Sequence, residues 1–187
     1  MTFKFKCGLY VGRFQPLHYG HMDIIDQMLT ECEKVIVAVG SAQESGTMRN
    51  PLTYSFRKQL IREVYFDYLD KIEVVPINDR EKYSDDFSWG IYLFERIHKQ
   101  CGLCPDVIYE GEEHVRAHWY DECNVPVIKV SRTKRPVSGT MIRNMFVNDR
   151  KGVMYPYVPN TIYFNHYEEI RKEIQNARIN TRCNPLD

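Results

Sequence analysis

The sequence predicts a single α/β domain built on a Rossmann-like, doubly wound five-stranded parallel sheet with helices on both faces. Short apolar runs typical of buried parallel strands alternate along the chain with segments whose apolar residues recur at helical spacing. Five such runs in alternation with helices are the pattern of an open α/β sheet. Across the 187 residues there is no internal repeat, low-complexity tract or linker that would indicate a second domain.

The first half of the chain contains two expected strands and two expected helices. Residues 5–11 and 35–39 are apolar runs of the buried parallel type. The segment between them carries apolar residues at helical spacing: Met22, Ile25, Met28, Leu29 and Cys32. Thr53 has the character of a helix N-cap. The helix after it is expected to bury one stripe of side chains: Phe56, Leu60, Ile61, Val64, Tyr65 and Tyr68.

The second half continues the alternation and ends in helices. The remaining strands are expected at residues 72–77, 106–109 and 125–130, and helices at residues 87–99, 114–120, 138–146 and from about Asn160 onward. This divides the domain into an α/β core, residues 1–150, and a C-terminal helical extension, residues 151–187. The polar end of the extension, residues 178–187, is expected to be loosely ordered.

The charge balance, the apolar runs and the cysteines indicate which classes of protein this chain could belong to. The chain has 25 Lys and Arg residues and 25 Asp and Glu residues, so its formal net charge is zero. It therefore lacks the overall positive charge that favours binding to nucleic acid. No run approaches the roughly 18 apolar residues of a membrane helix, and residues 1–6 lack the apolar core of a signal peptide. Together with six scattered cysteines, expected to be reduced thiols, this predicts a cytoplasmic protein.

The turn after the first strand concentrates polar side chains at a helix start. It reads Gly12-Arg13-Phe14-Gln15-Pro16-Leu17-His18-Tyr19-Gly20-His21. A helix N-terminus presents unpaired N–H groups and the positive end of its dipole, which favours phosphate. His18 and His21 are three residues apart and so point to one side of the first helical turn, and Gly20 allows close approach of a ligand. These residues predict a polyphosphate site.

Three other segments follow strands and should reach the same edge of the sheet. Residues 40–45, with Arg49 and Asn50 close behind, follow the second strand, and Asn78 follows the third. Ser138-Gly139-Thr140-Met141-Ile142-Arg143 follows the fifth strand and opens a helix, offering hydroxyls, N–H groups and a guanidinium about one turn in. Distant segments therefore converge on one crevice with phosphate-binding chemistry.

The two motifs together resemble the nucleotidylyltransferase superfamily, which carries HxGH near its N-terminus and a later Ser/Thr-rich helix start ending in Arg. More narrowly, the chain resembles the archaeal-type nicotinamide mononucleotide adenylyltransferases. That likeness depends on residues 12–21, on Gly40-Ser41-Ala42-Gln43 and Asn50-Pro51-Leu52-Thr53, and on the strand end at residues 76–79. It extends over roughly residues 8–143.

The resemblance implies adenylyl transfer from ATP to nicotinamide mononucleotide, giving NAD and pyrophosphate with Mg²⁺ held mainly by substrate phosphates. It implies catalytic roles for His18, His21, Arg13 and Arg143. The residues expected at ATP are Gly12, Arg13, Phe14, Gln15, His18, Gly20, His21, Ser138, Gly139, Thr140 and Arg143. No dedicated protein cage for the metal is expected, because Mg²⁺ usually keeps several waters.

The acceptor site is expected to include Asn78, Trp89, Arg49 and Asn50, with Trp89 stacking on the cationic nicotinamide ring. Packing in the core is an equally good interpretation of Trp89. The segment before Trp89 and the acidic residues 110–113 depart from the family pattern, and the basic residues 132–135 are a further candidate contact for the triphosphate. The acceptor could therefore be the nicotinic acid nucleotide or another small phosphate, with ATP or CTP as donor. A nucleotide-binding sensor is a third hypothesis.

Two features outside these motifs remain. Cys101 and Cys104 have CxxC spacing but no second pair at zinc spacing, so a structural role is favoured over zinc or redox chemistry. Aromatic residues near the C-terminus are expected to pack the last helix or to form the interface of a homo-oligomer: Tyr155, Tyr157, Tyr163 and Tyr167.

Overall fold

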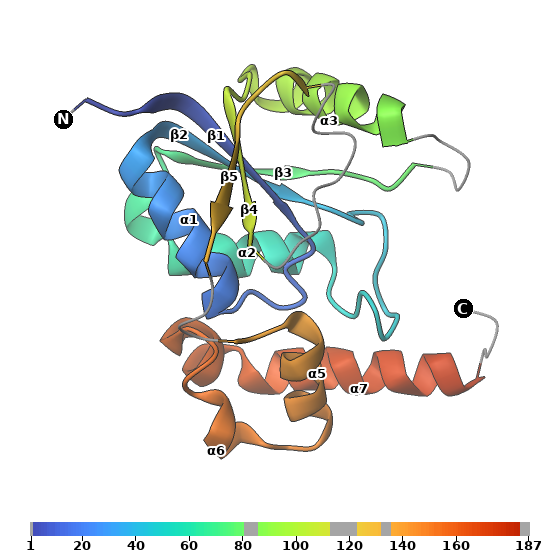
Figure 1. The fold of residues 1–187 in the computed structure, drawn as a ribbon. Helices are drawn as coiled ribbons and strands as arrows, with labels where there is room; N and C mark the ends of the chain where they lie inside the picture. The colour runs from blue at the N-terminus through green and yellow to red at the C-terminus, as the bar shows by residue number, and fades with distance from the viewer. Residues whose placement is uncertain (1, 81–85, 113–122, 132–135, 184–187) are drawn as a thin grey trace.

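A central sheet of five parallel strands organises the computed structural model, which describes residues 2–80, 86–112, 123–131 and 136–183 (Figure 1). The strands lie in the order β3-β2-β1-β4-β5, so the chain reverses its winding between β1 and β4. Their bounds are β1 Phe5–Gly12, β2 Cys32–Val39, β3 Ile72–Pro76, β4 Val107–Gly111 and β5 Val127–Val130. This confirms the predicted fold class.

Strand register places the functional loops on one level edge. Gly12 pairs with Val39, and Val39 pairs with Pro76, so β1, β2 and β3 all end at the same height. Gly40 N–H then donates to the Gly12 carbonyl at 2.9 Å, which keeps the two following loops together. In an open α/β sheet this carboxyl edge is where ligands bind.

Helices cover both faces, and a further helical layer lies below the sheet in Figure 1. The helices are α1 Tyr19–Glu31, α2 Tyr54–Val64, α3 Asp86–Cys101, α5 Gly139–Val147, α6 Lys151–Met154 and α7 Tyr167–Cys183, with short turns η1 Phe66–Tyr68 and η2 Thr161–Asn165. One hydrophobic core joins the sheet to α1, α2, α5 and α7. A second core on the other face includes Leu93 and Ile97 of α3.

Capping residues fix where two of the helices begin. The Thr53 hydroxyl accepts from Phe56 N–H at 3.2 Å, as its position in the sequence predicts. The Ser138 hydroxyl accepts from Met141 N–H at 3.2 Å and so starts α5. Each cap satisfies a donor that the first helical turn would otherwise leave unpaired.

Several boundaries differ from expectation. Cys32 begins β2 instead of continuing the preceding helix, and α2 ends at Val64, which leaves Tyr68 exposed in η1. The expectation of loose order for residues 178–183 is wrong, because α7 continues to Cys183 as it packs Ile174 and Ala177 into the core. The helix expected at residues 114–120 and the basic residues 132–135 lie outside the described residues, as do residues 184–187.

None of the helices in the described ranges combines the length and apolar character needed to cross a membrane.

Candidate active site

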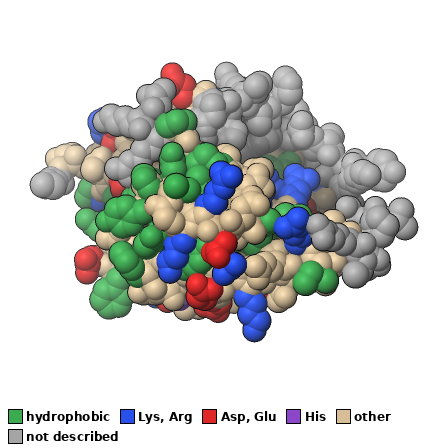
Figure 2. Space-filling view, turned by 90° about the horizontal axis from the view of Figure 1, so that it is seen from below, with side chains coloured by type: hydrophobic (Ala, Val, Ile, Leu, Met, Phe, Trp, Pro, Cys, Tyr) green, Lys and Arg blue, Asp and Glu red, His purple; other side chains and the backbone are tan. Residues whose placement is uncertain are grey.

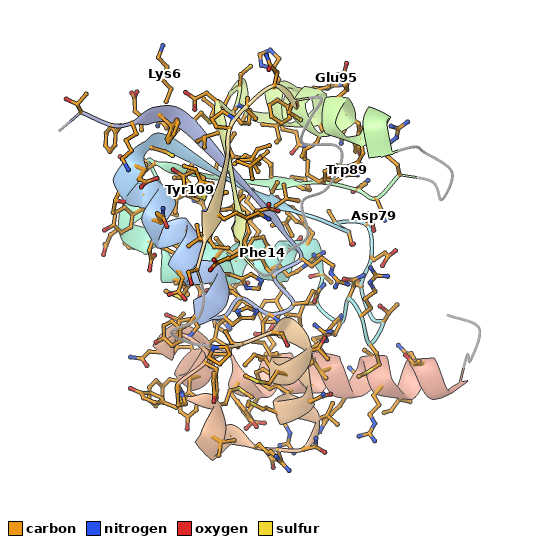
Figure 3. All side chains as sticks on the ribbon, in the orientation of Figure 1. Lys6, Phe14, Asp79, Trp89, Glu95 and Tyr109 are labelled. Atoms are coloured by element: carbon orange, nitrogen blue, oxygen red, sulfur yellow. The ribbon has the colours of Figure 1, made fainter. Side chains whose placement is uncertain are left out.

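The carboxyl edge of the sheet opens into a cleft of about 1040 Å³. Its walls come from the β1–α1 turn, the β2–α2 loop, the ends of β3 and β4, the first part of α3 and the start of α5. Figure 3 labels three of its residues, Phe14, Asp79 and Trp89, which come from three of these segments. A cleft this size at the point where the strand order reverses is the expected ligand site of a doubly wound sheet.

Ten of the residues predicted to bind ATP line this cleft: Gly12, Arg13, Phe14, Gln15, His18, His21, Ser138, Gly139, Thr140 and Arg143. The eleventh, Gly20, is buried in the first turn of α1 and is not among the lining residues. The two sequence motifs, more than a hundred residues apart, therefore line one cavity.

The two histidines act as one unit at the start of α1. Their rings stack with centroids 3.7 Å apart and planes inclined by 19°, so they do point to one side. The backbone N–H of His18 donates to Nδ1 of His21 at 3.3 Å. Since that N–H can only donate, Nδ1 must accept, and the neutral His21 ring carries its proton on Nε2. The site therefore presents a fixed tautomer beside a helix N-terminus.

Arg143 joins the two motifs directly. Its Nη1 donates to the carbonyl of Gln15 at 3.0 Å, and its Nη2 donates to the Thr140 hydroxyl at 3.1 Å. Arg143 is only 9% exposed and lines the cleft. Burial and the charge of Arg13 lower the pKa of Arg143. A desolvated guanidinium held in this way is a preorganised group for an anion.

The cleft lining contains three arginines and two carboxylates, Asp79 and Glu112. Burial lowers the pKa of Arg13, and the neighbouring charge of Arg49 lowers it further. Arg13, Arg49 and Arg143 all line the cleft. An anion bound near these arginines would reduce the repulsion among their charges.

Gly139 is needed for the close approach of α5 to the β1–α1 turn. A Cβ atom there would lie 3.1 Å from Nη1 of Arg143 and 3.4 Å from the Gln15 carbonyl oxygen. Replacing Gly139 with alanine is expected to displace the guanidinium of Arg143 and to lower kcat/KM for the expected adenylyl transfer about tenfold. The stability of the fold should be preserved, because alanine has the higher helix propensity. Enzyme kinetics and thermal unfolding check this.

The matched control is Gly152→Ala in α6, where an added Cβ meets nothing within 4 Å. It should leave kcat/KM unchanged. Equal kcat/KM values for the two variants would contradict the role given to Gly139.

The residues predicted for the acceptor separate into two groups. Trp89 and Arg49 line the cleft, whereas Asn78 and Asn50 are not among the lining residues. The Asn78 carbonyl accepts from the Tyr92 hydroxyl at 3.3 Å. Asn50 is fully buried, and its side chain donates to Glu44 while its N–H donates to the Thr47 hydroxyl. The prediction that Asn50 binds the acceptor stays a prediction; in this structure its buried side chain stabilises the loop that carries Arg49.

Gln15, which lines the cleft as predicted, also has a structural role. Its side-chain amide pairs with the main chain of Leu52, donating to the carbonyl at 3.0 Å and accepting from the N–H at 2.9 Å. Its own carbonyl receives Arg143. Gln15 therefore connects the β2–α2 loop to the start of α5, and its side chain is only 3% exposed.

Sequence reasoning missed Arg57, and it named none of Tyr10, Ser41 and Glu112 as a site residue, although these three line the cleft. Arg57 is fully buried and donates hydrogen bonds to four carbonyl oxygens around the cleft loops. One signal was available: Arg57 falls on the buried face of α2, between Phe56 and Leu60. A cation on an apolar helix face indicates a specific buried partner.

The fold, the paired histidines and the cleft arginines define a nucleotidylyltransferase. A family model described as cytidylyltransferase-like matches residues 9–145, and the chain belongs to that family. Curated relatives narrow this to the archaeal nicotinamide-nucleotide adenylyltransferases. The protein of that name from Methanococcus aeolicus is 30% identical over 177 residues, which cover 93% of this chain and 95% of the relative. The one from Thermococcus onnurineus is 31% identical over 144 residues, 76% and 73% of the two chains.

Solved structures share the fold. A bifunctional NMN adenylyltransferase/ADP-ribose pyrophosphatase from Francisella tularensis, complexed with AMP and a manganese ion, matches with a TM-score of 0.74 at 22% identity. A NadR protein in complex with NAD and AMP-PNP matches with a TM-score of 0.62 at 24% identity. The two matches cover 95% and 84% of this chain. They cover 53% and 45% of the two solved proteins, so this chain spans only about half the length of each.

Proposed function

We propose that the chain transfers the AMP group of ATP to nicotinamide mononucleotide and releases NAD and pyrophosphate. The observation that carries this proposal is the bond between Arg143 and the Gln15 carbonyl, which brings two phosphate-binding helix starts to one cleft. The similarity over almost the full length to proteins named nicotinamide-nucleotide adenylyltransferase supports the choice of substrates.

The reaction needs positioning and charge stabilisation more than a base. The 5′-phosphate of the acceptor is already ionised at neutral pH. One of its oxygens attacks the α-phosphorus of ATP, a new P–O bond forms, and the bond from the α-phosphorus to the bridging oxygen breaks, so that pyrophosphate leaves with that electron pair. In-line displacement of this kind is accelerated mainly by orientation and by cationic groups around the phosphates.

The cleft residues fit distinct parts of that process. In this proposal His18 and His21, which stack at the start of α1 and line the cleft, donate hydrogen bonds to α-phosphate oxygens as negative charge develops. Arg13 and Arg143 neutralise the triphosphate and the departing pyrophosphate. Gly12, Phe14, Ser138 and Thr140 line the remaining ATP wall. Each of these roles depends on the stated geometry and not on proton abstraction.

We infer that Mg²⁺ accompanies ATP and is coordinated mainly by phosphate oxygens and water. The cleft lining includes the carboxylates of Asp79 and Glu112, oxygen ligands of the kind Mg²⁺ accepts directly or through water. Gln43 holds Asp79 in place through hydrogen bonds of 3.0 and 3.3 Å. When bound, the ion would neutralise charge on the triphosphate.

Trp89 is the proposed platform for the nicotinamide ring. It lines the cleft but also packs against the hydrophobic core on the α3 face of the sheet. Replacing Trp89 with alanine is expected to raise the KM for nicotinamide mononucleotide about tenfold, because a stacked cationic ring loses its aromatic face. Trp89→Phe should restore most of the affinity. Steady-state kinetics with each substrate varied in turn measures both.

The control for Trp89 is Phe66→Ala, which removes an aromatic ring that is 72% exposed on η1. It should change neither KM. A Trp89→Ala variant whose KM for ATP rises as much as its KM for the acceptor would assign Trp89 to core packing alone.

A direct assay tests the proposed function. The protein is incubated with ATP, Mg²⁺ and nicotinamide mononucleotide, and NAD and pyrophosphate are quantified. Parallel reactions contain nicotinic acid mononucleotide, other small phosphorylated acceptors, or CTP in place of ATP. Equimolar NAD and pyrophosphate are expected. Turnover of another acceptor without NAD formation would overturn the proposal, and ATP binding without any turnover would favour a sensor.

We also infer a cytoplasmic homo-oligomer. Five cysteines, Cys7, Cys32, Cys101, Cys104 and Cys123, are free thiols, as in a reducing compartment. Tyr155 and Phe164 are 50% and 65% exposed and contact each other and Tyr163. Figure 2 shows hydrophobic side chains gathered on one flank of the underside. Such a surface suits a subunit interface, and the molecular mass in solution tests this inference.

A further inference from the structure

Two residues of the cleft lining have backbone conformations that side chains disfavour. Phe14, in the β1–α1 turn, has φ 51°, and Ser41, in the β2–α2 loop, has φ 47°. The left-handed region is unfavourable for residues other than glycine and persists only where surrounding interactions hold the backbone. Both loops therefore need interactions with other parts of the chain to hold these backbone conformations.

The guanidinium of Arg57 bonds to the main chain on both strained turns. Its Nη1 donates to the Arg13 carbonyl, in the peptide that precedes Phe14, at 2.9 Å. The same nitrogen donates to the Gly40 carbonyl at 2.8 Å, and Nη2 donates to the Ser41 carbonyl at 3.0 Å. Both peptide groups next to Ser41 and one next to Phe14 are thus fixed by one side chain.

The carbonyl oxygens of Arg13, Gly40 and Ser41 would disfavour phosphate binding if they had no hydrogen-bond partner. The ends of parallel strands leave carbonyl oxygens without partners in the sheet, and their partial negative charge opposes a bound phosphate. Arg57 satisfies three of them and brings a positive charge beneath the cleft. Nε of Arg57 anchors the group to its own helix through the Thr53 carbonyl at 3.3 Å.

We propose that Arg57 is a positioning residue for adenylyl transfer. Its buried guanidinium sets the β1–α1 turn, which carries Arg13, at a fixed distance from the β2–α2 loop, which carries Arg49. Arg57 is 0% exposed and is not among the cleft-lining residues, so it acts through these loops and does not touch either substrate. The inference rests on the proposed function.

The test compares Arg57→Ala and Arg57→Lys with Arg62→Ala, which removes an exposed arginine from the same helix. NAD formation is measured with each substrate varied, with and without methylguanidinium. Arg57→Ala is expected to lower kcat/KM about a hundredfold, since small displacements of reacting groups have effects of that size. Methylguanidinium should restore activity at least about fivefold, because it supplies the missing fork of donors. Arg57→Lys should be intermediate, and Arg62→Ala should equal wild type.

Two results would overturn the proposal: wild-type kcat/KM in Arg57→Ala, or a loss of activity in both Arg57 variants that matches their loss of helical circular dichroism. If the wild-type protein forms no NAD, the proposed function fails separately. The positioning role is then tested by ATP affinity, measured by calorimetry, which should fall in Arg57→Ala and not in Arg62→Ala.

Discussion

Replacing Arg143 with alanine is expected to lower kcat/KM for NAD formation about a thousandfold. The loss has two sources: the charge that would neutralise the departing pyrophosphate is removed, and the bond that holds α5 to the Gln15 carbonyl is broken. Arginines that stabilise phosphoryl transfer contribute effects of this order. Steady-state kinetics measures the loss, and circular dichroism establishes that the variant is folded.

A lysine at this position should recover only part of the rate, because it keeps the charge but not the fork that contacts Gln15 and Thr140 together. The control is Arg150→Ala, since Arg150 is exposed just beyond α5 and is not among the cleft-lining residues. It should behave as wild type. If Arg143→Ala kept more than about a tenth of the wild-type kcat/KM, the role of Arg143 in stabilising the leaving group would be wrong.

The second large effect is expected at His21, where two amide side chains separate structure from catalysis. Asparagine places an oxygen near the position of Nδ1, so His21→Asn can still accept from the His18 N–H. The asparagine side chain is too short to place a group at the position of Nε2. Glutamine places its amide nitrogen near Nε2. We therefore expect His21→Asn to lower kcat several hundredfold with the fold intact, and His21→Gln to lose less.

The measurement is kcat together with ATP affinity and thermal stability for both variants. Because the developing charge is greatest in the transition state, ATP affinity should change much less than kcat. His98→Ala, an exposed histidine on α3, is the control and should be fully active. If His21→Asn were fully active and His21→Gln were not, the important contact would be the one made by Nδ1.

The sheet and the phosphate-binding walls could be predicted from sequence because they depend on local patterns. Apolar runs gave the five strands, and the polar residues directly after the first and fifth strands led to the two motifs that meet in the cleft. Strand ends in a parallel sheet must share an edge, so the spatial convergence follows from topology.

What could not be predicted depends on where distant main-chain atoms lie. Arg57 is defined by the carbonyls of Arg13, Gly40 and Ser41, and no spacing in the sequence shows that these oxygens face α2. Asn50 and Gln15 were expected at the ligands because they belong to the motifs that carry the family resemblance. The motifs do not show that the Gln15 side chain pairs with the main chain of Leu52, or that the Asn50 side chain donates to Glu44.

The C-terminal helices support the cleft from outside its two motifs. The family model ends at residue 145, yet both walls of the phosphate site are attached to the chain beyond it. Phe146 of α5 packs on Tyr167 with ring centroids 5.0 Å apart, and Tyr19 N–H, at the start of α1, donates to the Tyr157 carbonyl at 3.0 Å. A substitution that breaks either contact is therefore expected to alter turnover although both motifs stay unchanged.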